Sequence, residues 1–107
     1  MDVAKIQAES RAVSDQVFSE LVSNVEEVAE LIAACLKAGG KVMACGNGGS
    51  SADAQHFAGE LVNRFLMNRK PYAGIALNTD ASVMTSISND FSYEEVYSKQ
   101  VEGLGRA

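Results

Sequence analysis

Apolar side chains recur every three or four residues along the first 38 residues, and this period is that of a helix. The first proline is Pro71 and the first glycine is Gly39, so no helix-breaking residue interrupts the pattern. We expect helices over residues 1–38, arranged as a hairpin that turns at Ser23 and Asn24, with Asn24 capping the second helix. The apolar positions are Val3, Ile6, Val13, Val17, Leu21, Val25, Val28, Leu31, Ile32, Cys35 and Leu36.

From residue 41 onward, short apolar runs alternate with segments of helical period. Residues 41–45 (KVMAC) and 72–77 (YAGIAL) are apolar and bounded by glycine or proline, which predicts buried strands. Residues 52–65 carry an apolar helical stripe, residues 82–87 fit a strand or a short helix, and residues 93–104 fit a final helix. Strands that alternate with helices form βαβ units with a parallel sheet. We therefore expect an α/β fold in which helices flank a parallel sheet.

A glycine-rich segment, Gly46 to Ser51 (GNGGSS), joins the first expected strand to the helix after it. Glycine allows a sharp turn and a close approach to a ligand, and the N-terminus of a helix attracts anions. The spacing of Ser50 and Asp53 resembles a capping box. The segment has neither the GxGxxG spacing of dinucleotide-binding loops nor the GxxxxGK[ST] spacing of P-loops. It fits either an anion-binding loop or an ordinary tight turn before a capped helix.

His56, the only histidine, lies four residues before Glu60 on the expected helix. Residues at this spacing share one helix face. An imidazole nitrogen and a carboxylate oxygen are both zinc ligands, and the carboxylate can instead act as a general base. Two ligands do not complete a zinc site, so at least two more must come from elsewhere. The alternative is a solvated or capping histidine beside a surface glutamate.

Two other groups of polar residues are candidates for binding. Asn89 and Asp90 follow an apolar run, where a loop between a strand and a helix would lie, and ligands gather at the carboxyl ends of parallel strands. The same residue types are also common in turns and helix caps. Arg64 lies two turns after His56 on the expected helix, where it can meet a phosphate or pair with a carboxylate.

Composition narrows the classes of function. Nine basic and 14 acidic residues give a net charge of −5, so the chain lacks the basic surface that binds nucleic acids. It has no apolar run long enough for a membrane span, and its N-terminus does not resemble a signal peptide. Cys35 and Cys45 lie ten residues apart without a CxxC motif, which excludes a disulfide scaffold or a zinc finger. We expect a soluble cytoplasmic protein without nucleic-acid or membrane partners.

The combined motifs resemble the phosphoheptose isomerase family, which has the sugar-isomerase (SIS) fold. The segments that carry the resemblance are KVMACGNGGSSADAQHFAGELVNRF, AGIALNTD, SISNDF and EEVYSKQVEGLGRA. They extend from about Ala38 to Ala107, and the N-terminal helices agree in layout. The resemblance implies a flavodoxin-like three-layer arrangement. It also implies conversion of sedoheptulose 7-phosphate to glycero-manno-heptose 7-phosphate, a step toward bacterial cell-surface heptose.

The resemblance also implies a zinc cofactor and a homotetramer with sites at subunit interfaces. The N-terminal helices have more apolar surface than a small sheet can cover, and packing against another subunit is an outlet for it. His56 and Glu60 correspond to zinc ligands, and Glu60 also corresponds to the catalytic base. Arg64 corresponds to a residue that reaches a neighbouring subunit's substrate, and Asn89 and Asp90 to residues on the sugar chain. The full set of implied substrate-binding residues is Asn47, Gly48, Gly49, Ser50, Glu60, Arg64, Asn89 and Asp90.

Members of this family continue beyond the length of this chain. Their second half carries a serine- and threonine-rich phosphate loop, together with a glutamine and a histidine that complete the zinc site. We therefore expect residues 1–107 to form one partial SIS domain, with helices over 1–38 and the first half of the sheet unit over 41–107. We do not expect full catalysis from these 107 residues alone.

Two other functions use the same fold. A non-catalytic binding protein that associates with the bacterial replication initiator also resembles this sequence, notably in the QHFA, NRF and ALNTD segments. A sugar-phosphate sensor would use the glycine-rich loop without turnover. Glu60 and Gly49 favour the isomerase, since the initiator-binding relative has an apolar residue at the first position and lacks the second glycine.

Overall fold

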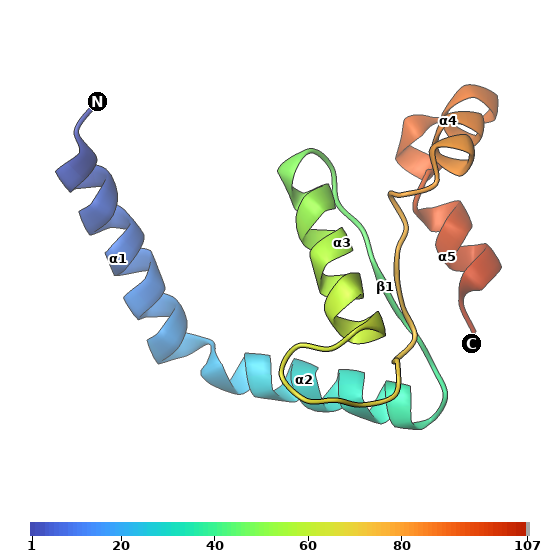
Figure 1. Cartoon of the computed structure of the whole chain (residues 1–107). Coiled ribbons are helices and arrows are strands. Elements are labelled where there is room, and N and C mark those ends of the chain that lie inside the picture. The colour runs from blue at the N-terminus through green and yellow to red at the C-terminus, as the bar shows by residue number, and fades with distance from the viewer. Residues whose placement is uncertain (107) are drawn as a thin grey trace. The chain divides into compact units, whose positions relative to one another are not determined.

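A computed structural model describes residues 1–106. The chain forms two compact units, residues 1–34 and the segment from Cys35 onward. The expected domain limits, 1–38 and 41–107, end at Ala107, which lies outside the described residues. In chain order (Figure 1) the elements are α1 (Val3–Glu20), α2 (Val22–Lys37), β1 (Val42–Ala44), α3 (Gly49–Val62), β2 (Gly74–Ala76), α4 (Ala81–Asp90), the 3-10 helix η1 (Tyr93–Glu95) and α5 (Ser98–Leu104). This order confirms the α/β class.

Two helices form the N-terminal segment, as predicted, but they do not turn back as a hairpin. The Leu21 amide donates to the Val17 carbonyl at 2.9 Å, and the Leu21 carbonyl accepts from the Val25 amide at 3.0 Å. Helical hydrogen bonding therefore continues through the junction, and a reversal would break it. The junction lies at Leu21 instead of Ser23, and Asn24 lies inside α2 instead of capping it. A pair of polar residues without glycine or proline is a weak helix breaker.

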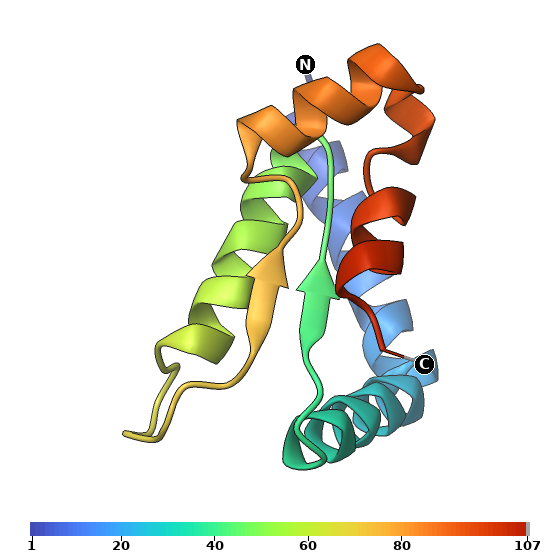
Figure 2. The ribbon, with the colours of Figure 1, turned by 90° about the vertical axis from the view of Figure 1, so that its right-hand side faces the viewer.

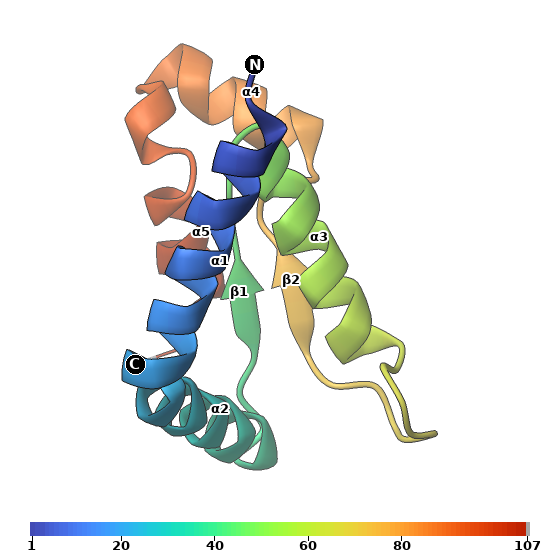
Figure 3. The same cartoon turned by 90° about the vertical axis from the view of Figure 1, so that its left-hand side faces the viewer.

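The two strands form a parallel sheet with the pairs Val42–Gly74, Met43–Ile75 and Ala44–Ala76. Figure 2 shows α3 on one side of the strands and α5 on the other, while α4 crosses above their carboxyl ends. Figure 3, from the opposite side, shows the same order of layers. Helices therefore flank a small parallel sheet, as the sequence predicted.

Small side chains allow α3 to lie close to the sheet. Ala54 and Ala58 of α3 are buried against Ala76, and Ala44 packs at the edge of this cluster. At Gly74, a Cβ atom would lie 2.9 Å from the Leu61 Cβ, closer than side chains tolerate. The alternation of side chains along each strand turns Met43 and Ile75 to the other face.

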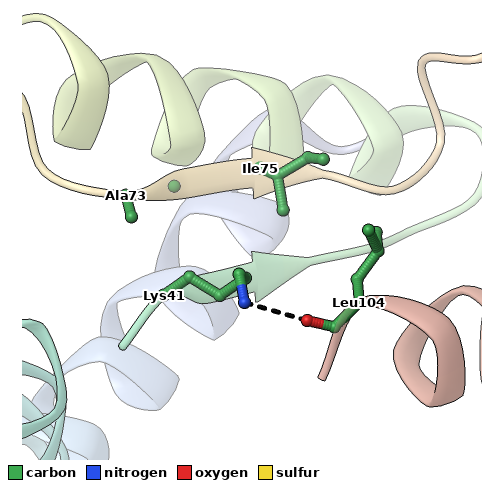
Figure 4. Close-up of a pocket in the computed structure, with 5 residues that line it drawn as sticks. Lys41, Ala73, Ile75 and Leu104 are labelled. Carbon is green, nitrogen blue, oxygen red and sulfur yellow. Dashed lines mark hydrogen bonds between the residues drawn. The ribbon is translucent and has the colours of Figure 1, made fainter. Parts of the chain in front are cut away.

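The other face of the sheet meets the end of α5 around an apolar hollow of about 170 Å³ (Figure 4). Lys41 spans this hollow, where its Nζ donates to the Leu104 carbonyl at 2.8 Å. Lys41 and Ala73 directly precede the two strands, so the hollow lies toward their amino ends. Ligands of open α/β sheets bind at the opposite, carboxyl ends, so this hollow is not the candidate site.

Three expected elements differ in detail. Residues 82–87 belong to helix α4, because Asp80 caps it: the Asp80 Oδ1 accepts from the Val83 amide at 3.0 Å. The helix expected over 93–104 divides into η1 and α5. The helix expected over 52–65 begins at Gly49 and ends at Val62. Within residues 1–106, no helix is both long enough and apolar enough to cross a bilayer.

Candidate functional site

The glycine-rich loop leaves the carboxyl end of β1 and enters α3, and two of its glycines are required by geometry. Gly48 has φ +57°, a conformation that other residues adopt only with strain. At Gly46, a Cβ atom would lie 2.6 Å from the Ser50 Oγ and would also clash with the Ser50 carbonyl. Gly49 is different, since a Cβ there would meet open space. The first turn of α3 is therefore open to a ligand at Gly49.

Ser50 closes the loop on itself instead of capping α3. Its Oγ accepts from the Asn47 amide at 2.9 Å and donates to the Asn47 carbonyl at 2.7 Å. Gly48 is the N-cap residue of α3 and makes no side-chain cap hydrogen bond. The capping-box interpretation of Ser50 and Asp53 is therefore wrong, because the Ser50 hydroxyl is already committed to Asn47. The consequence is a fixed backbone at Asn47.

Two tyrosines hold the side chain of Asn47. Its Oδ1 accepts from the Tyr93 hydroxyl at 2.6 Å and from the Tyr97 hydroxyl at 2.9 Å. The single hydrogen of the Tyr97 hydroxyl is shared between Asn47 Oδ1 and the Gly46 carbonyl oxygen, which lies 2.8 Å from the same hydroxyl. Desolvation at this partly buried position raises the pKa of Tyr97, and Tyr93 and Cys45 add to the shift. Both tyrosines were missed in the sequence, where only their spacing of four residues was visible.

His56 and Glu60 lie together on α3, as predicted. The His56 Nε2 and the Glu60 Oε1 are 3.3 Å apart, and both side chains are accessible, with 77% and 36% of their surfaces exposed. Two donors on a tetrahedral zinc ion, at bonds of about 2.0–2.1 Å, are separated by roughly 3.3 Å. The pair therefore fits two adjacent ligands of a zinc ion. No group of three or more ligating side chains occurs within residues 1–106, so further ligands must come from outside them.

Arg64 does not lie on α3, which corrects the sequence interpretation. The helix ends at Val62, and Arg64 in the following segment donates to the Asn68 side chain. Arg69, which the sequence analysis missed, explains the early end. Its guanidinium donates to the carbonyl oxygens of Glu60 and Leu61 at 2.6 and 2.8 Å. These bonds satisfy the last carbonyls of α3, which a longer helix would have used internally.

Asn89 and Asp90 are the last two residues of α4, not a loop after a strand. Both are exposed, and the Asn89 Nδ2 donates to the Asp90 Oδ1 at 2.9 Å. In the part of the chain that the structure describes, no hydrogen bond joins them to the glycine-rich loop or to His56. The following element, η1, makes that link instead through Tyr93.

Asn78 joins the two loops at the carboxyl ends of the strands and was also missed. Its Nδ2 donates to the Ser51 carbonyl at 3.3 Å, so the segment after β2 contacts the first turn of α3. The Asn78 Oδ1 is buried and has no hydrogen-bond partner within the described residues. The only sequence signal was the position of Asn78 directly after an apolar strand.

Comparison with known proteins agrees with this geometry. The family model described as SIS domain matches residues 6–106. Phosphoheptose isomerase from Syntrophotalea carbinolica is 51% identical over 96 residues, which cover 90% of this chain and 49% of that protein. Phosphoheptose isomerase 1 from Campylobacter jejuni is 55% identical over 85 residues, which cover 79% of this chain and 46% of that protein.

Solved structures give the same result. The phosphoheptose isomerase of Neisseria gonorrhoeae superposes with a TM-score of 0.87 at 47% identity, covering 98% of this chain and 54% of that one. The enzyme from Francisella tularensis superposes with a TM-score of 0.87 at 34% identity, covering 99% of this chain and 58% of that one. The chain spans about half the length of the curated relatives it matches. It belongs to the SIS domain family and matches the N-terminal part of phosphoheptose isomerases, which confirms the resemblance seen in the sequence.

Proposed function

We propose that these residues are the N-terminal part of a zinc-dependent aldose–ketose isomerase that converts sedoheptulose 7-phosphate to glycero-manno-heptose 7-phosphate. The observation that carries the proposal is the separation of 3.3 Å between the His56 Nε2 and the Glu60 Oε1 on an accessible helix face. This pair lies in the second half of α3, the helix that the glycine-rich loop enters from the carboxyl end of β1. The similarity to phosphoheptose isomerases supports the same reaction.

Glu60 is the proposed catalytic base. Isomerisation moves a proton between two adjacent sugar carbons through an ene-diolate, and a carboxylate near both carbons can remove the proton and return it. Glu60 is partly exposed, so its carboxylate can reach a bound sugar. A zinc ion, held by His56 and Glu60 with ligands from outside the described residues, would stabilise negative charge as it develops on the sugar oxygen.

The glycine-rich loop is the proposed binding element. Asn47, Gly48, Gly49 and Ser50 surround the first turn of α3, where amide groups and the positive end of the helix favour a polar, oxygen-rich ligand. Asn89 and Asp90, at the end of α4, would bind the sugar chain. Binding of the remote phosphate would orient the reacting carbons over Glu60.

A homotetramer in the cytoplasm is part of the proposal. Arg64 would then reach the substrate of a neighbouring subunit, since it leaves α3 and is exposed. The N-terminal unit offers a surface for such assembly, an apolar groove of about 180 Å³ on α1 and α2. The groove is lined by Val17, Phe18, Leu21, Val22, Val25 and Glu26.

The test is turnover of sedoheptulose 7-phosphate by the full-length protein that carries this sequence, with zinc and after chelation. Glu60→Gln removes the base and is expected to lower kcat by roughly 10²- to 10⁴-fold. Glu102→Gln is the matched control, because it makes the same change at an exposed position of α5. Absence of turnover in the zinc-loaded wild type would reject the isomerase and favour a binding protein of the same fold.

A further inference from the structure

The orientation of the Asn47 carboxamide is set by residues far away in the sequence. Tyr93 and Tyr97 lie 46 and 50 residues after Asn47, and both hydroxyls lie within hydrogen-bond distance of its Oδ1. Tyr93 begins η1, and Tyr97 directly precedes α5. The segment after α4 is therefore hydrogen-bonded to the loop after β1, although the local sequence of neither segment indicates this contact.

We propose that Tyr93 and Tyr97 are positioning residues, which hold Asn47 so that its Nδ2 amino group donates a hydrogen bond to an acceptor oxygen of the bound sugar phosphate. The inference rests on the proposed function for the identity of the ligand. Tyr93 and Tyr97 are not among the substrate-binding residues that the family resemblance implies. Their hydrogen bonds also decide which half of the Asn47 amide meets the ligand.

The hydrogen-bond capacity of an amide explains this assignment. A carboxamide oxygen has two lone pairs. Here the Tyr93 hydroxyl donates to it at 2.6 Å, and the Tyr97 hydroxyl, whose one hydrogen is shared with the Gly46 carbonyl oxygen, lies at 2.9 Å on its other side. The amide then has only its two N–H donors left for a ligand. An acceptor oxygen suits this arrangement, whether it is a carbonyl, a phosphate oxygen or a hydroxyl lone pair.

The backbone of Asn47 is fixed as well, so the side chain has little freedom left. Ser50 bonds to both the amide and the carbonyl of Asn47. The Tyr97 hydroxyl also contacts the Gly46 carbonyl, which ties the arrangement to the end of β1. A group held in its binding orientation before the ligand arrives loses less entropy on binding.

Kinetics of the full-length protein on sedoheptulose 7-phosphate test the inference, with Tyr93→Phe and Tyr97→Phe singly and together. Each change removes one hydroxyl and keeps the ring. Tyr72→Phe is the matched control, because its ring lies 4.3 Å from the Arg69 guanidinium, away from the loop. We expect the double variant to raise KM by about 10-fold while kcat changes less than about twofold, because one aligned donor is lost from binding. An unchanged KM, or an equal rise in Tyr72→Phe, would overturn the inference.

A second measurement separates this inference from the isomerase proposal. In the ¹H–¹⁵N spectrum, addition of sedoheptulose 7-phosphate should shift the Asn47 side-chain NH₂ signals of wild type and shift them much less in the double variant. This holds even if no turnover occurs, so failure of the reaction leaves the test intact. Equal shifts in both proteins would reject the role of the tyrosines.

Asn47→Asp provides a variant that leaves both tyrosines in place. Aspartate still accepts from the two hydroxyls, but it offers no donor to the ligand. We expect it to weaken binding of sedoheptulose 7-phosphate at least as much as the double tyrosine variant does. Binding equal to that of wild type would show that Nδ2 does not meet the ligand and would overturn the proposal.

Discussion

The Arg69 guanidinium donates to the Glu60 carbonyl oxygen at 2.6 Å, from a segment nine residues further along the chain. It also donates to the Leu61 carbonyl at 2.8 Å and lies over the ring of Tyr72 at 4.3 Å. The last turn of α3 has no basic residue of its own. Arg69 therefore supplies the positive charge that favours the negative end of this helix, next to the proposed base.

Replacement of Arg69 should destabilise the end of α3. Arg69→Gln removes the forked donor and the charge, and we expect the free energy of unfolding to fall by about 1–3 kcal/mol. Arg69→Lys keeps the positive charge but lacks the forked guanidinium donors, so the free energy of unfolding should fall by less than in Arg69→Gln. Urea denaturation of the three proteins measures the difference. Equal stability of Arg69→Gln and wild type would show that the contacts contribute nothing.

Two glycines near α3 should respond in opposite directions to alanine. Gly74→Ala places a Cβ 2.9 Å from the Leu61 Cβ and 3.3 Å from the Ala58 carbonyl, and we expect a loss of about 1–3 kcal/mol. Gly59→Ala, within α3, meets open space and should stabilise by up to about 1 kcal/mol. Thermal or urea unfolding measures both. A neutral Gly74→Ala would mean that α3 can move away from the strand without cost.

His56 should be needed for zinc binding by the full-length protein. His56→Ala removes the imidazole donor that lies 3.3 Å from the Glu60 carboxylate, and we expect the affinity for zinc to fall by about 100-fold or more. Asp53→Asn is the matched control, since it changes a polar side chain one turn earlier on α3. Competition with a chromogenic chelator measures the affinity. Unchanged affinity in His56→Ala would place the zinc ion elsewhere.

The part of the fold that the sequence predicted is the part encoded locally. The apolar run around Val42–Ala44 and the helical period around Ala54 each lie within one short segment, and both elements were found. The His56–Glu60 pair was predicted for the same reason, because a spacing of four residues fixes its geometry on a helix. Arg64 and Arg69 show what a local pattern cannot predict. Both are basic residues after the same apolar stripe, and only the folded packing determines that Arg69 is the one bonded to the last carbonyls of α3.

Long-range contacts account for what the sequence analysis missed. The hydrogen bond between Asn47 and Tyr93 joins residues 46 positions apart, and no periodicity reports such a contact. The same holds for Asn78, which lies in the loop after β2 and donates to the Ser51 carbonyl in the first turn of α3. The roles of Ser50 and Asp53 were misread because a capping motif and a loop closure use the same residue types.

Tyr97 is a donor to the loop only while its hydroxyl is protonated. Desolvation, with smaller effects from Tyr93 and Cys45, raises the pKa of this hydroxyl above its ordinary value in the folded protein. In the unfolded chain it titrates at about 10. The folded state therefore holds the proton more tightly, and its contribution to stability is complete below about pH 10 and is lost as the pH rises through the folded pKa.

The free energy of unfolding should therefore fall with rising pH above about pH 10, and Tyr97→Phe should reduce this dependence. The variant lacks the titrating hydroxyl, so its stability is lower at neutral pH but changes less between about pH 9 and about pH 11. Urea unfolding across this range measures the slope, with Tyr72→Phe as the control because Tyr72 lies away from the loop. If Tyr97→Phe keeps the wild-type slope while Tyr72→Phe loses it, the alkaline transition belongs to another group and the hydroxyl of Tyr97 does not link the loop to pH.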